Sequence, residues 1–292
     1  MNAVTANGTQ RSEGHLEDDG RDCLAGHKAC AIQSEPDYLA WRAVLWDLDG
    51  TLADTDPMWV EAERRCATRH GIAWTDELSL RMTGASLPTC ARILRQAGVG
   101  LPAERLIQEL VEDMHVMYDE YAERAESSGA IGYDGRAEIF EADAGFSGTR
   151  HETAEAKPMR DAVPWAPGAY DLLQRLHEFS IPSILVTGSS RSLAERVLAA
   201  TPYGTFTGCV AGDDGVAHKP DPAPYLAAAR LAGLPPEACL AFEDSAGGVA
   251  SALAAGVHVV GVNACARISL PDDIGCAVIP ALTAIKRFAD VP

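Results

Sequence analysis

Acidic, hydroxyl and basic side chains follow four short apolar runs of the sequence. The residues at these four points are Asp47, Asp49, Thr187, Gly188, Lys219, Glu243 and Asp244. Clustered carboxylates repel one another unless a cation neutralises them. Mg²⁺ prefers oxygen ligands and often binds through a few carboxylates together with a substrate phosphate. The residue types therefore predict magnesium-dependent chemistry on a phosphate group.

Asp47 is the candidate nucleophile. An aspartate can attack phosphorus and form a phosphoaspartate, while Lys219 and the metal neutralise the oxygens of the transferred group. Asp49 can protonate the leaving alcohol and later deprotonate a water. Two residues apart on an extended backbone, the two carboxylates would not reach one phosphate. We therefore expect a turn at Gly50 to bring the carboxylate of Asp49 toward the same phosphate as Asp47.

The apolar runs are predicted to be strands of one parallel sheet. Predicted strands cover residues 43–46, 183–187, 206–211, 240–243 and 257–262. Predicted helices between them cover residues 191–200, 222–232 and 246–255. Such alternation indicates an α/β, Rossmann-like fold with helices on both faces of the sheet. The carboxyl ends of parallel strands share one edge, where ligands bind. The polar residues that follow the four apolar runs should therefore meet at that edge.

Residues 56–124 predict an all-helical block inserted into the α/β domain, which itself comprises residues 41–55 and 164–292. Helical spacing predicts four helices, at about 57–70, 76–83, 88–98 and 102–124. Asp56 is the expected N-cap of the first helix, followed by a proline in its first turn.

Two segments have a different composition. Residues 1–40 are acidic and have almost no periodic apolar residues, which predicts a disordered tail. Residues 125–163 are rich in Gly, Ala and acids, which predicts a flexible insert. Cys23, His27 and Cys30 in the tail could share a metal, but three candidate ligands without a fourth are a weak signal.

The whole chain of 292 residues carries a net charge of -18. An acidic surface repels the phosphate backbone, so we expect no nucleic-acid partner. No segment approaches the roughly 18 consecutive apolar residues of a membrane span, and residues 1–30 lack the apolar core of a signal peptide. The eight cysteines form no CxxC pair and are expected to be reduced thiols. We expect a cytoplasmic monomer without a membrane partner.

The four points resemble the four motifs of the haloacid dehalogenase superfamily, in the same order. They read Asp47-Leu48-Asp49-Gly50-Thr51-Leu52, Val186-Thr187-Gly188-Ser189, His218-Lys219-Pro220-Asp221-Pro222 and Phe242-Glu243-Asp244-Ser245-Ala246-Gly247-Gly248. The long helical insert after the first motif is similar to that of the subgroup containing β-phosphoglucomutase and many small phosphatases. The resemblance covers about residues 41–124 and 164–292.

The resemblance implies a role for each residue. Asp47 would be nucleophile and metal ligand, and Asp49 the acid/base, with its backbone carbonyl on the metal. Asp244 would complete the metal site, with Glu243 assisting. Thr187, Gly188 and Lys219 would bind phosphate, and the helical block would be a cap that closes over the substrate.

Two residues narrow the range of reactions that the resemblance allows. Superfamily dehalogenases lack an acid two positions after the nucleophile, so Asp49 favours phosphoryl transfer over carbon–halogen cleavage. The phosphoglucomutases carry a cap-loop arginine just after a glycine, where this chain has Leu87. We therefore expect a phosphatase acting on a small phosphorylated metabolite such as a sugar phosphate.

Two alternatives remain at this point. One is a phosphosugar mutase of the β-phosphoglucomutase type, with Arg81, Arg92 or Arg191 supplying the second positive site. The other is a non-catalytic regulatory relative of the fold. Such a relative would be expected to lose Asp47, Asp49 or Lys219, and all three are present.

Overall fold

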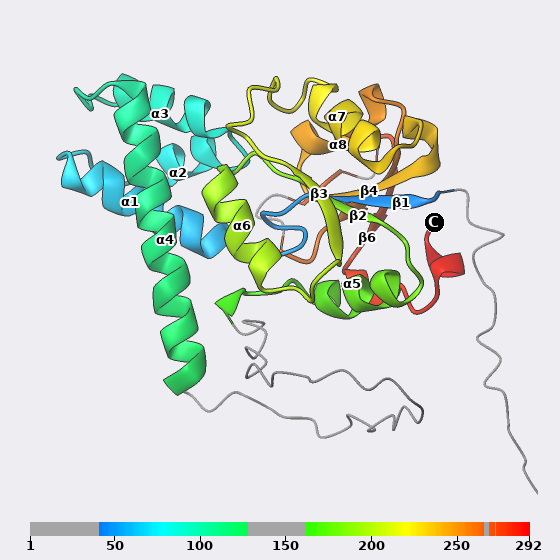
Figure 1. Ribbon diagram of the computed structural model, residues 1–292. Helices are drawn as coiled ribbons and strands as arrows, with labels where there is room; N and C mark the ends of the chain where they lie inside the picture. The colour runs from blue at the N-terminus through cyan, green and yellow to red at the C-terminus, as the bar shows by residue number, and fades with distance from the viewer. Residues whose placement is uncertain (1–40, 128–161, 266–268, 272) are drawn as a thin grey trace, which may run out of the picture. The chain divides into compact units, whose positions relative to one another are not determined.

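The computed structural model describes residues 41–127, 162–265, 269–271 and 273–292 (Figure 1). The predicted acidic tail, with Cys23, His27 and Cys30, lies outside the described residues. So does most of the predicted insert, residues 128–161.

A six-stranded sheet with the order β3-β2-β1-β4-β5-β6 forms the centre of the described chain. Its strands are β1 (Ala43–Trp46), β2 (Ser183–Val186), β3 (Phe206–Val210), β4 (Cys239–Glu243), β5 (His258–Val262) and β6 (Ala277–Ile279). Every pair of neighbouring strands is parallel. The predicted α/β fold class is confirmed. β6 goes unpredicted because three residues are too few to show a pattern.

Helices cover both faces of this sheet. They are α5 (Ala169–Glu178), α6 (Arg191–Ala199), α7 (Ala223–Ala232) and α8 (Ala246–Ala254). Val44 and Trp46 of β1 pack into one apolar cluster with α5 and α6, whereas Ala43 and Leu45 pack into another with α7 and α8. Side chains alternate between the faces of a strand, so a strand buried on both faces is apolar throughout. That is why residues 43–46 form a continuous apolar run.

Four further helices lie between β1 and α5 in the sequence. They are α1 (Asp56–Arg69), α2 (Asp76–Met82), α3 (Leu87–Gln96) and α4 (Ala103–Ser127), and we call residues 56–127 the helical block. The block has its own apolar core, which includes Cys66, Leu94 and Leu106. The observed bounds lie within three residues of the predicted ones. The division of the chain into a core and a cap domain stays a prediction.

The start of α1 differs from the prediction. Asp56 is the first residue of the helix, and Thr55 occupies the N-cap position. The hydroxyl of Thr55 does not cap the helix; it donates a hydrogen bond to Oδ1 of Asp49 at 2.7 Å. The predicted N-cap at Asp56 is therefore wrong, because the chain turns one residue earlier and directs the Thr55 hydroxyl toward the loop after β1.

Among the helices that the structure describes, none combines the length and the apolar character needed to cross a membrane. The six cysteines of the described residues are free thiols, as expected, and Cys66, Cys90 and Cys239 are buried.

Candidate active site

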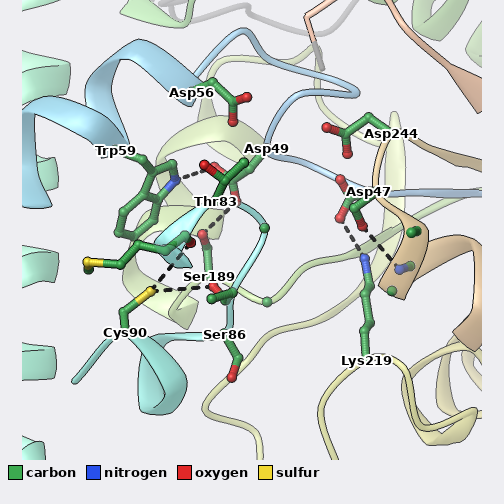
Figure 2. A pocket seen from close by; sticks show the side chains of 18 of the residues that line it. Asp47, Asp49, Asp56, Trp59, Thr83, Ser86, Cys90, Ser189, Lys219 and Asp244 are labelled. Atoms are coloured by element: carbon green, nitrogen blue, oxygen red, sulfur yellow. Dashed lines mark hydrogen bonds and ion pairs between the residues drawn. The ribbon is translucent and has the colours of Figure 1, made fainter. Parts of the chain in front are cut away.

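The loops that follow the strands bring four of the predicted site residues together, and Figure 2 shows three of them, Asp47, Lys219 and Asp244. Asp47 directly follows β1, Glu243 ends β4, and Asp244 comes next in the chain. Lys219 enters from the segment between β3 and α7. One carboxylate oxygen from each of Asp47, Glu243 and Asp244 lies within 4.8 Å of the others. The predicted meeting of the strand ends therefore occurs.

Lys219 lies between two of these carboxylates. Its Nζ donates to Oδ1 of Asp47 at 2.5 Å and to Oε1 of Glu243 at 2.6 Å, and also to the carbonyl oxygen of Val186 at 2.9 Å. Burial alone would lower the pKa of Lys219, but Asp47 and Glu243 overcome this and raise it above its ordinary value. The ammonium therefore stays charged next to Asp47.

The acids of the site are hard to ionise together without a further cation. Burial, followed by the charge of Glu243, raises the pKa of Asp47 to about 7, although Lys219 acts in the opposite direction. Burial and the charges of Asp47 and Glu243 also raise the pKa of Asp244 well above its ordinary value. The repulsion between these carboxylates is the kind that a divalent cation relieves.

Glu243 differs from the other two acids in its surroundings. It is fully buried, and its Oε1 accepts from Lys219 and, at 2.5 Å, from the hydroxyl of Tyr225. Its Oε2 accepts from Ser245 at 3.3 Å. Asp47 and Asp244 line the cavity of the site, whereas Glu243 does not line it and accepts a hydrogen bond from Lys219. Tyr225 was not among the predicted site residues.

The loop after β1 lies directly against Asp244. Gly50 has a φ of 84°, and a Cβ at this position would overlap the Asp244 carboxylate. Thr51 donates its hydroxyl to Oδ1 of Asp244 at 3.2 Å. Only glycine adopts this backbone conformation without strain and leaves room for the acid. The expected turn at Gly50 is present.

Four donors hold the carboxylate of Asp49. Thr55 and the indole N–H of Trp59 donate to Oδ1, at 2.7 and 2.8 Å. Ser189 donates to Oδ2 at 2.6 Å, and the hydroxyl of Thr187 lies 3.4 Å from the same oxygen. Sequence reasoning missed Thr55 and Trp59, and it placed Ser189 in the second motif without giving it a role. A residue's distance from Asp49 along the chain says nothing about a hydrogen bond in space.

Thr187 lies beside Asp49 and the start of the loop that follows β2. Its hydroxyl oxygen accepts the backbone N–H of Ser189 at 3.0 Å. Gly188 and Ser189 line the main cavity. The side of the cavity next to Asp47 thus has an ammonium from Lys219, a hydroxyl from Ser189, and uncrowded backbone at Gly188, where a Cβ would meet nothing within 4 Å.

A cavity of about 360 Å³ extends from this edge of the sheet to the helical block, a size that suits a small metabolite. The block contributes Asp56, Trp59, Glu63, Met82, Thr83, Gly84, Ala85, Ser86, Leu87 and Cys90 to its lining. Figure 2 shows Trp59, Thr83 and Cys90 on the side away from Lys219. Within the described part of the block, no Lys or Arg lines the cavity.

The three arginines considered for a second phosphate lie elsewhere. Arg81 donates to Oε1 of Gln96 at an exposed position, and Arg191 is paired with Asp214. Neither of them, nor Arg92, lines the cavity.

Comparison with known proteins identifies the family. The model of the haloacid dehalogenase-like hydrolase family matches residues 41–256. The chain is a haloacid dehalogenase-like hydrolase. Protein CbbY of Rhodobacter capsulatus is 30% identical over 227 residues, which cover 75% of this chain and 84% of that protein. Hexitol phosphatase A of Escherichia coli is 31% identical over 225 residues, 76% of this chain and 83% of the phosphatase.

Solved structures of haloacid dehalogenase-like proteins have the same fold. A crystal structure of CbbY from Rhodobacter sphaeroides in complex with phosphate has a TM-score of 0.63 and 22% identity, covering 86% of this chain and 98% of that one. The expected family and the expected enzyme class, a phosphatase of the haloacid dehalogenase superfamily, are confirmed. The roles of the individual site residues stay predictions.

Proposed function

We propose that the enzyme hydrolyses a small phosphate monoester, such as a sugar phosphate, through a phosphoaspartate on Asp47 and with the help of Mg²⁺. The observation that carries this proposal is the placement of Asp47, a buried carboxylate at the cavity whose Oδ1 accepts a hydrogen bond from Lys219 at 2.5 Å. A cation beside the nucleophile would also attract the phosphate oxygens of a substrate.

The residues of the site suit Mg²⁺. Asp47 and Asp244 offer carboxylate oxygens at the cavity, and the backbone carbonyl of Asp49 is the third ligand that the family resemblance implies. Oxygen-only ligands favour a hard cation. Burial and the charges of the neighbouring acids raise the pKa of Asp47 and of Asp244, and a bound cation would act in the opposite direction. When bound, Mg²⁺ would neutralise charge on the substrate's phosphate oxygens.

The protein's own groups would perform two successive displacements. An Oδ of Asp47 attacks phosphorus, and the bond from phosphorus to the ester oxygen breaks as Asp49 gives that oxygen a proton. Asp49 then takes a proton from water, whose oxygen attacks phosphorus and releases inorganic phosphate from Asp47. Lys219 would stabilise the negative charge on the transferred group in both steps.

The lining of the cavity favours hydrolysis over mutase chemistry. A phosphosugar mutase must hold a bisphosphate, and each phosphate needs its own positive site. The sheet edge supplies Lys219, but no Lys or Arg of the described block lines the opposite wall. Hydroxyls alone neutralise no charge, and bidentate phosphate binding is the task that suits arginine.

One experiment tests both the proposed hydrolysis of a phosphate monoester and the preference for hydrolysis over mutase chemistry. The enzyme is incubated with Mg²⁺ and a panel of sugar and polyol phosphates, together with nitrophenyl phosphate, and released phosphate is measured. β-Glucose 1-phosphate is assayed with a catalytic amount of glucose 1,6-bisphosphate, and glucose 6-phosphate is measured in parallel. We expect phosphate release without accumulation of glucose 6-phosphate. Rapid isomerisation with little free phosphate would support the mutase instead, and no hydrolysis of any ester by the folded protein would contradict the proposal.

Several expectations from the sequence stay predictions. They are the cytoplasmic location, the monomeric state, and the absence of nucleic-acid and membrane partners. The proposed partner is a small phosphorylated metabolite, with the helical block acting as the cap over it.

A further inference from the structure

Tyr225 is a buried residue of α7 to which the proposed mechanism gives no step. Its side chain is fully buried and does not line the cavity. Its hydroxyl donates to Oε1 of Glu243 at 2.5 Å, the same oxygen that accepts from Lys219 at 2.6 Å. Burial, followed by the charge of Glu243, raises the pKa of Tyr225 well above its ordinary value, so the hydroxyl stays a donor. Two donors therefore meet at one buried carboxylate oxygen.

The carboxylate of Glu243 is confined on its other sides as well. Its Oε2 accepts from the hydroxyl of Ser245 at 3.3 Å, and a Cβ added at Gly248 would overlap the carboxylate. A buried carboxylate is tolerated when a cation and hydrogen-bond donors compensate for the lost water. Lys219 supplies the cation, and Tyr225 is a further donor. Glu243 is thus a fixed acceptor inside the protein, away from the lining of the cavity.

The ammonium of Lys219 has three protons and meets three acceptors. One is Oδ1 of Asp47, at the cavity, and the other two are Oε1 of Glu243 and the carbonyl oxygen of Val186. The ring of Tyr225 also faces the ammonium, with Nζ 5.3 Å from the ring centroid, and an aromatic face attracts a cation. Since a lysine side chain is long and flexible, these contacts determine where its charge lies.

We propose that Tyr225 is a positioning residue, which fixes Glu243 and thereby holds the ammonium of Lys219 beside Asp47. The inference rests on the proposed phosphatase function and adds to it a residue outside the four motifs. Without the hydroxyl, Oε1 of Glu243 loses one of its two donors, and its less shared charge draws Lys219 away from Asp47. A charge that stabilises phosphoryl transfer is most effective when it is already in place before the reaction.

Tyr225→Phe removes the hydroxyl and keeps the ring that faces Lys219. Lys219 would act on the charge that develops during transfer, so we expect kcat on a sugar phosphate to fall about tenfold or more, with KM changed less than about threefold. Inhibition constants give a second readout. Orthovanadate adopts a five-coordinate geometry like that of the transition state, whereas inorganic phosphate does not. We expect the inhibition constant of vanadate to rise about tenfold and that of phosphate less than about threefold.

Tyr118→Phe is the matched control, because the chemical change and the surroundings of the ring are similar. Tyr118 is also buried, and the guanidinium carbon of Arg196 lies 5.4 Å from its ring centroid. Among the described residues, however, its hydroxyl has no hydrogen-bond partner, and it does not line the cavity. Its kcat and both inhibition constants should equal those of the unmodified enzyme. Thermal melting shows whether each variant is folded.

If Tyr225→Phe does not fold, Glu243→Gln tests the same chain of contacts. The amide oxygen can still accept from Tyr225 and Lys219, but a neutral group holds an ammonium less strongly than a carboxylate does. We expect the same fall in kcat and the same selective loss of vanadate binding. An unchanged kcat in the folded Glu243→Gln protein would overturn the inference.

The outcomes separate positioning from a structural role and from the proposed function. A folded Tyr225→Phe protein with a lower Tm but an unchanged kcat would show that the hydroxyl only stabilises the fold. A higher KM without a fall in kcat, or equal rises in the two inhibition constants, would also overturn the inference. In each of these cases the phosphatase function would stand. If the unmodified enzyme hydrolyses no phosphate ester, the phosphatase function fails and the role of Tyr225 fails with it.

Discussion

The indole N–H of Trp59 donates a hydrogen bond to Oδ1 of Asp49 at 2.8 Å. Trp59 lies in α1 of the helical block, and Asp49 lies in the loop that follows β1. The bond therefore connects the wall of the cavity to the proposed acid/base. Since Trp59 is a donor only, it can orient the Asp49 carboxylate but cannot carry its proton.

Replacing Trp59 tests whether this bond positions Asp49. Trp59→Phe removes the donor and keeps an aromatic ring. Hydrogen bonds to charged groups contribute about 1.5–3 kcal/mol, so we expect kcat on a sugar phosphate to fall roughly tenfold or more. Nitrophenyl phosphate, whose leaving group needs no proton, should be affected less in the first step. Trp74→Phe is the control, because Trp74 packs against the core of the block and does not line the cavity. Equal losses for both esters would argue against a positioning role.

Asp47→Asn tests the nucleophile. The amide cannot form an acyl phosphate, and removal of a covalent catalyst typically costs roughly 10⁴-fold or more in kcat. Phosphoenzyme trapped by acid quench and detected by mass spectrometry should be present in the unmodified enzyme and missing in the variant. Substantial turnover by a well-folded variant would contradict the assignment of Asp47.

Asp49→Asn tests the acid/base. We expect a loss of roughly 10²–10⁴ in rate for substrates with alcohol leaving groups. Formation of the phosphoenzyme from nitrophenyl phosphate should suffer less, because nitrophenolate leaves without a proton. Rapid-quench measurement of the burst separates this first step from hydrolysis of the phosphoenzyme. A burst rate reduced equally for both kinds of ester would count against the role.

The raised pKa of Asp47 predicts how stability depends on pH and metal. Without metal, the folded protein keeps a proton on Asp47 up to about pH 7, whereas the unfolded chain loses it near about pH 4. The folded state therefore binds more protons between these values, and its free energy of unfolding should fall as pH rises from about 4 to about 7.

Mg²⁺ should reverse this loss by replacing the proton. Thermal melts with Mg²⁺ and with chelator should show a larger increase in Tm at about pH 8 than at about pH 5.5, because binding stabilises the folded state and competes with protons for the carboxylates. Chelator should also abolish turnover, and Mg²⁺ should restore it. In Asp47→Asn the dependence of Tm on pH in the chelated protein should be weaker. An increase in Tm that is independent of pH would contradict the metal site.

Gly50→Ala tests the close approach of the first loop to Asp244. The new Cβ would overlap the Asp244 carboxylate, in addition to the strain at a φ of 84°. Gly71→Ala provides a control for strain alone, because Gly71 has a φ of 76° and nothing lies within 4 Å of its added Cβ. Strain of this kind costs about 1–2 kcal/mol. We expect both variants to lose Tm but only Gly50→Ala to lose turnover and affinity for Mg²⁺; equal turnover would show that the contact is unimportant.

The parallel sheet could be predicted from the sequence because three of its strands, β1, β2 and β4, are buried along their whole length. β1 is fully buried along its length, and an uninterrupted apolar run followed at once by Asp47 identifies both the strand and the sheet edge. α5 could have been found in the same way, since Tyr170, Leu172, Leu173 and Leu176 recur at helical spacing and are buried. β6 has three residues, too few to show the alternation that identifies a strand.

The surroundings of Asp49 and the part of the cavity wall formed by the helical block could not be predicted in this way. The donors to Asp49 include Ser189, 140 positions later in the chain, and no local pattern reports a contact at that distance. Glu63 looks like any other acid in a helix rich in charge, because its burial depends on α3, which contributes Cys90. Motifs identify residues that act on the phosphate, whereas the residues that meet the rest of the substrate leave no motif.

The helical block lies as one insertion between β1 and α5, and this arrangement has an evolutionary consequence. In the proposed mechanism, bond breaking belongs to loops of the sheet edge, such as those of Asp47 and Lys219, whereas the opposite wall of the cavity comes from a separate stretch of chain that includes Met82, Thr83 and Leu87. We therefore expect mutations in that stretch to change which metabolite is accepted while the residues proposed to act on the phosphate stay the same. Trp59 would limit such divergence, because it lines the cavity and also donates a hydrogen bond to Asp49, the proposed acid/base.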